Sequence, residues 1–78
     1  MNKIKKMEEY FFDYRDDTLE ATRDIRTRLK VAKSGQSINF VCKEDQIFKF
    51  LREITFNNAV ITSQETTEEG VFIILQKS

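Results

Sequence analysis

Cys42 is the one thiol of the chain, and the chain contains no histidine. Without histidine, the Ser-His-Asp and Cys-His arrangements that activate a nucleophile are excluded. A single cysteine also excludes an internal disulfide framework and a structural zinc site built from Cys and His. The remaining chemistry is that of the Cys42 thiol or of carboxylates, so the sequence leaves open whether the protein is an enzyme.

Four carboxylates gather around the expected start of the first helix: Asp13, Asp16, Asp17 and Glu20. Oxygen ligands of this kind suit a hard divalent cation. Asp17 and Glu20, however, have the spacing of a capping box, in which an acidic pair begins a helix. Because helix capping explains these residues without a metal, we expect no metal site and no cofactor.

A row of basic residues follows along the same helix: Arg23, Arg26, Lys30 and Lys33. Such a row contacts RNA phosphates, contacts an acidic protein, or is simply solvated. The chain has thirteen basic and thirteen acidic residues and no net charge. That balance argues against a general nucleic-acid or membrane binder, so we expect a protein partner.

The spacing of apolar residues predicts six elements: strands over 8–14, 37–42, 59–66 and 71–75, and helices over 18–33 and 44–56. Their order is βαβαββ, which predicts an α+β two-layer sandwich with a four-stranded mixed sheet and two helices on one face. We expect residues 1–7 to form a flexible basic arm before a single domain over 8–78.

The face of the sheet without helices is expected to carry large apolar side chains. Tyr10 and Phe12 alternate with Phe11 along the first strand. Exposed patches of this kind usually mark contacts with a partner. The alternative is that the N-terminal arm covers the face through Ile4 and Met7. Tyr10 and Phe12 therefore join the basic row as candidate interaction residues.

Four local features accompany the element order: Asp13 near the end of the first strand, a helix exit over Lys33-Ser34-Gly35-Gln36, Lys43-Glu44-Asp45, and the terminal strand over Gly70–Lys77. Together they resemble the TusA/SirA family of small sulfur-carrier (sulfurtransferase) proteins over residues 10–77. The resemblance implies the sheet order 1-2-4-3. It also implies a persulfide-carrying Cys in a Cys-Pro-x-Pro motif at the start of the first helix. That motif falls on Thr18, Leu19, Glu20 and Ala21, which include neither Cys nor Pro.

Three interpretations follow. The first is a TusA/SirA-like domain without its acceptor Cys that acts as a non-catalytic protein-interaction or regulatory module. The resemblance implies a cysteine desulfurase, another sulfur-relay protein or a second copy as its partner. The second is a sulfur carrier that uses Cys42 as persulfide acceptor, although a strand Cys is also an ordinary small apolar residue.

The third interpretation is an RNA-contacting domain that uses the basic first helix, because a similar fold occurs in the C-terminal domain of a translation initiation factor. No apolar run approaches the length of a membrane span. We therefore expect a cytoplasmic protein that makes no contact with a membrane.

Overall fold

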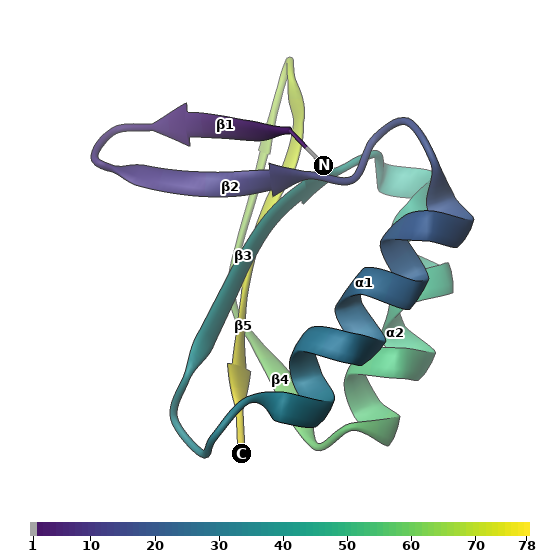
Figure 1. Cartoon of the computed structure of the whole chain (residues 1–78). Coiled ribbons are helices and arrows are strands. Elements are labelled where there is room, and N and C mark those ends of the chain that lie inside the picture. The colour runs from purple at the N-terminus through teal and green to yellow at the C-terminus, as the bar shows by residue number, and fades with distance from the viewer. Residues whose placement is uncertain (1) are drawn as a thin grey trace.

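A computed structural model describes residues 2–78 as one sheet with two helices packed on it (Figure 1). The elements are β1 (Lys3–Lys6), β2 (Glu9–Asp13), α1 (Thr18–Val31), β3 (Ser37–Cys42), a 3-10 turn η1 (Glu44–Gln46), α2 (Ile47–Phe56), β4 (Ala59–Thr67) and β5 (Gly70–Lys77). The sheet order is β1-β2-β3-β5-β4, with β2 and β3 parallel and the other neighbours antiparallel. The α+β class expected from the sequence is confirmed.

The sheet has five strands, so the prediction of four was wrong. The residues expected as a flexible arm supply the added strand, because Lys3–Lys6 pairs antiparallel with β2. Met7 turns the chain with a φ of 58°, a left-handed conformation that is uncommon for a residue with a side chain. Met1 lies outside the described residues. The four strands that the sequence did predict lie side by side as β2-β3-β5-β4.

Both helices begin close to their predicted starts. The Asp17 side chain accepts a hydrogen bond from the backbone N–H of Glu20, which caps α1 as the sequence predicts. The helix ends at Val31 rather than Lys33, because Ala32 is already extended. The second helix begins as the 3-10 turn Glu44–Gln46 and continues as α2.

The two faces of the sheet carry two separate apolar clusters. The larger lies between the sheet and the helices and includes Ile25, Leu29, Phe40, Phe50 and Leu75. The smaller lies on the opposite face and consists of Phe11, Val41 and Phe72, with Ile4 and Ile74 packed against it. β1 thus covers part of the open face through Ile4, whereas Met7 is exposed.

The β1–β2 hairpin curls over this open face. Lys6 near the hairpin tip forms an ion pair with Glu65 of β4, although β1 and β4 are the two edge strands. The Lys6 ammonium also lies 4.9 Å from the centre of the Phe72 ring. The strands of the hairpin therefore run across the direction of β3 and β5, so the sheet is strongly bent at this edge (Figure 1). Within residues 2–78, no helix is long and apolar enough to cross a membrane.

Candidate functional site

The four residues at the start of α1 on which the resemblance places a sulfur-carrying motif make structural contacts or are exposed. The Thr18 hydroxyl accepts a hydrogen bond of 2.9 Å from the Gln46 side-chain amide, and Asp17 caps the helix beside it. Leu19 and Glu20 point outward and are exposed, whereas Ala21 is fully buried against the sheet. The one hydroxyl among these four residues is thus engaged by Gln46.

Gln46 connects the loops at the carboxyl ends of β2 and β3, a role that the sequence did not predict. Its side-chain nitrogen also donates to the backbone oxygen of Tyr14 at 2.9 Å. Its side-chain oxygen accepts from the backbone N–H of Lys43 at 2.7 Å. One buried amide therefore joins the loop after β2 to the loop after β3. A single glutamine in a charged segment carries no sequence signal of this role.

Cys42, the candidate persulfide acceptor, lies at the same end and is fully buried. Burial, reinforced by the negative charge of Asp45, raises the pKa of the thiol from 9.0 to about 12. A thiol in this state is protonated near neutral pH and out of reach of a reagent. The backbone around it is tight as well, because a Cβ on Gly70 would lie 2.7 Å from the Cys42 carbonyl oxygen.

Two of the four carboxylates at the start of α1 are engaged in local structure, Asp17 in the helix cap and Asp13 with Arg15. Both oxygens of Asp13 accept from the Arg15 guanidinium at 2.9 Å, and this contact lowers the pKa of Asp13. Asp16, Asp17 and Glu20 share the rim of a shallow hollow with Asn2 and Asp13. Across residues 2–78, no three His, Cys, Asp or Glu side chains are placed to hold a metal ion.

The four basic residues of the predicted row have different surroundings. Arg26 reaches across to α2 and binds Glu53 with two hydrogen bonds, of 2.7 and 3.1 Å. Arg26 and Lys30 share a surface hollow with residues of α2. Arg23 does not line that hollow, and Lys33 lies beyond the end of α1. Two of the four residues therefore share a hollow, and a common role for all four stays a prediction.

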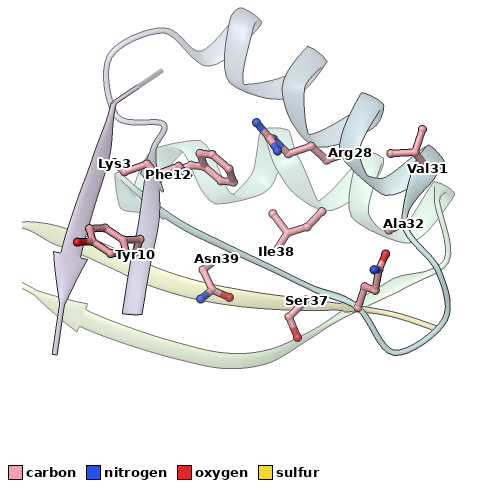
Figure 2. Close-up of a pocket in the computed structure, with 10 residues that line it drawn as sticks. Lys3, Tyr10, Phe12, Arg28, Val31, Ala32, Ser37, Ile38 and Asn39 are labelled. Atoms are coloured by element: carbon pink, nitrogen blue, oxygen red, sulfur yellow. The ribbon is translucent and has the colours of Figure 1, made fainter. Parts of the chain in front are cut away.

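A concave feature lies where β2 and β3 separate. These parallel strands pair over only two residue pairs, Phe12 with Phe40 and Asp13 with Val41. Before Phe12, the β1–β2 hairpin turns away from β3 (Figure 1). A cavity of about 540 Å³ opens between the hairpin, the last turn of α1 and the first half of β3 (Figure 2). We call it the β3 cleft, and its lining residues are Lys3, Tyr10, Phe12, Arg28, Val31, Ala32, Gln36, Ser37, Ile38 and Asn39.

The β3 cleft contains a strand edge without a partner. Ser37, Ile38 and Asn39 pair with β5 on one side, and within residues 2–78 none of them pairs with a strand on the other. Val41 directs its carbonyl toward β2, where it accepts from the N–H of Tyr14 at 2.9 Å. Backbone groups of alternate residues in a strand face the same side, so those of Ser37 and Asn39 point away from β5. The pairing of Phe12 with Phe40 uses the Asn39 carbonyl, which leaves the Asn39 N–H and the backbone groups of Ser37 facing the cleft.

The wall of the β3 cleft combines an aromatic ring with two cations. The Arg28 guanidinium lies 3.9 Å from the centre of the Phe12 ring, and the Lys3 ammonium lies 5.1 Å from it. Arg28 is held there by Asp24, which accepts from its Nε at 2.8 Å. Of the two candidate aromatic residues, Phe12 forms this wall and Tyr10 lies exposed at the rim (Figure 2).

The sequence predicted that Phe12 would lie on the open face of the sheet, but its side chain lies on the other face. It packs against the cluster beneath the helices, and Phe11 lies on the open face instead.

No protein-family model, no curated protein and no solved structure matches this chain. The β3 cleft is therefore interpreted from its own geometry.

Proposed function

We propose that this protein is a non-catalytic protein-interaction module that binds an extended segment of a partner in the β3 cleft. The observation that carries the proposal is the unpaired edge of Ser37–Asn39, which faces a cavity instead of another strand. An added strand would satisfy the backbone groups of Ser37 and the N–H of Asn39, which is how sheet edges commonly recognise peptides. Ile38, Val31 and Phe12 would supply apolar contacts, and Lys3 and Arg28 would favour an acidic residue in the segment.

A TusA/SirA-like (sulfurtransferase-family) ancestry is part of the same proposal. It is supported by the succession β2-β3-β5-β4 and by two helices on one face of the sheet. Thr18 at the motif position and the buried, protonated Cys42 favour a module without sulfur chemistry. Incubation with a cysteine desulfurase and free cysteine, followed by intact mass, tests this point: we expect no gain of sulfur. A gain that Cys42→Ser abolishes would restore the sulfur-carrier alternative.

Docking is tested with short random peptides displayed on phage and selected on the full chain. Ser37→Pro removes a backbone donor that faces the β3 cleft, at the first residue of a strand, where proline is tolerated. We expect selected peptides to bind the wild-type chain and to lose at least tenfold in affinity for Ser37→Pro.

Thr62→Pro is the matched control. Thr62 lies on the other edge of the sheet, at the irregularity of β4 between Ile61 and Ser63, and is outside the β4–β5 register. We expect this variant to bind the selected peptides as the wild type does. Equal loss in both variants, or peptides that shift no amide signal of Ser37–Asn39, would overturn the proposed docking site.

A further inference from the structure

A second concave surface lies on the opposite side of the helices, between α1 and α2. It measures about 530 Å³ and is lined by Arg26, Lys30, Arg52, Glu53 and Phe56. Three of these residues are cationic and one is a carboxylate. We call it the interhelical hollow. It shares no residue with the β3 cleft.

Phe56 is the unusual member of the interhelical hollow. Phe56 is 80% exposed, although phenylalanine is among the residues most often buried in folded proteins. Within residues 2–78, its ring stacks on no other aromatic side chain. An exposed aromatic side chain in a hollow is the type of residue that dominates the energetics of protein interfaces.

The charges around Phe56 are only partly balanced. Glu53 is bound by Arg26, and this contact lowers the pKa of Glu53 so that it stays ionised. Across residues 2–78, neither Lys30 nor Arg52 forms an ion pair with a carboxylate. The hollow therefore offers two free cations beside an exposed ring.

We propose that the interhelical hollow binds an acidic, amphipathic helix of a partner protein. An apolar residue of that helix packs on Phe56, and its carboxylates pair with Lys30 and Arg52. This is the helix-in-groove mode of recognition, with charge setting the orientation. The surface shares no residue with the β3 cleft, so the module would have two docking sites, one for an extended segment and one for a helix.

Two other occupants fit the hollow less well. A nucleic acid would place phosphates near the Glu53 carboxylate, and the chain lacks the net positive charge that attracts nucleic acid from a distance. A second copy joined symmetrically through this surface would bring two surfaces with the same excess of positive charge together, and their like charges repel. Of these three occupants, the acidic helix matches both the ring and the cations.

The probe is a synthetic amphipathic peptide of about four helical turns, with glutamate on one face and leucine on the other. A second peptide carries glutamine in place of every glutamate. We expect the acidic peptide to shift the amide signals of Lys30, Arg52 and Phe56 in the full-length protein, with affinity that weakens as salt increases. We expect the glutamine peptide to bind at least tenfold more weakly.

Phe48 provides a matched control for Phe56. Both lie on α2, and Phe48 is 82% exposed but does not line the hollow. We expect Phe56→Ala to weaken binding of the acidic peptide about tenfold and Phe48→Ala to change it less than twofold. Arg52→Gln should weaken it severalfold.

Three outcomes would overturn the proposal. The first is equal binding of the acidic and glutamine peptides. The second is equal loss in the Phe56→Ala and Phe48→Ala variants. The third is tighter binding of a single-stranded thymidine oligonucleotide than of the acidic peptide, which would assign the hollow to nucleic acid. Because the hollow and the β3 cleft share no residue, Ser37→Pro serves as a further control and should leave this binding unchanged.

Discussion

The two ends of the β2–β3 pair differ sharply. At the carboxyl end, Gln46 joins the loops, Cys42 is buried and Gly70 packs against the backbone. At the amino end, the strands separate and leave Ser37–Asn39 beside a cavity of about 540 Å³. The chemistry of an open α/β sheet normally gathers at the carboxyl ends of its strands. Here that end is closed by packing and hydrogen bonds, and the cavity lies at the opposite end.

This difference explains why the candidate residues of the sequence fell into two groups. Residues at the carboxyl end, such as Thr18 and Cys42, are used by the protein itself. Residues around the amino end, such as Tyr10 and Phe12, line an accessible cavity. Variants at the closed carboxyl end should therefore lower stability most, and variants at the surface should lower it least.

Gly70→Ala is expected to have the largest effect on the closed end. Gly70 has a φ of +145°, and an added Cβ would lie 2.7 Å from the Cys42 carbonyl oxygen, which is backbone and unable to move aside. We expect a loss of about 3 kcal/mol in the free energy of unfolding, measured by urea denaturation. Gly35→Ala is the control, because it introduces a side chain at a positive φ of +88° without crowding: no atom lies within 4 Å of the added Cβ. Equal losses in the two variants would show that crowding at the closed end is unimportant.

Gln46→Ala removes the buried amide that joins the two loops. The backbone oxygen of Tyr14, the hydroxyl of Thr18 and the N–H of Lys43 lose a partner together. We expect a loss of about 2 kcal/mol in the free energy of unfolding. Gln36→Ala is the control, because Gln36 is exposed and its side chain bonds one backbone N–H. A loss no greater than that of the control would contradict the role given to Gln46.

The buried thiol predicts how stability depends on pH. The Cys42 pKa is about 12 in the folded protein and 9.0 without burial, so the unfolded chain loses this proton first as pH rises. The free energy of unfolding should therefore fall between pH 9 and 12, by at most about 1.4 kcal/mol per pH unit from this group. Burial also raises the pKa of Tyr14, which acts in the same direction.

Cys42→Ala is the variant that isolates the contribution of the thiol. Denaturation across this pH range should give a shallower slope for Cys42→Ala than for the wild type. Identical slopes would mean that the thiol is accessible and unperturbed.

The Lys6–Glu65 ion pair is expected to contribute least. Both side chains are partly exposed, and such pairs are worth about 0.5 kcal/mol. We expect Lys6→Gln to lower the free energy of unfolding by about that amount and to leave peptide binding in the β3 cleft unchanged. A loss of cleft binding in this variant would mean that the hairpin tip controls the cleft.

The sequence predicted the elements that carry a strong apolar period and missed those that depend on tertiary contacts. The strand Ser37–Cys42 agrees residue for residue, and Asp17 caps α1 as expected. The strand Lys3–Lys6 was missed because four mostly charged residues show little alternation, and its pairing depends on the turn at Met7. The β3 cleft was missed because it arises where β2 leaves β3, and no residue type marks that separation.

Amide hydrogen exchange along β3 tests the central claim most directly, because it needs no ligand. Asn39 faces the cleft, whereas its neighbours Ile38 and Phe40 direct their backbone groups toward β5. We predict fast exchange at Asn39 between two protected neighbours. An Asn39 amide as protected as those of Ile38 and Phe40 would show that β2 and β3 pair along their full length and that the edge is closed.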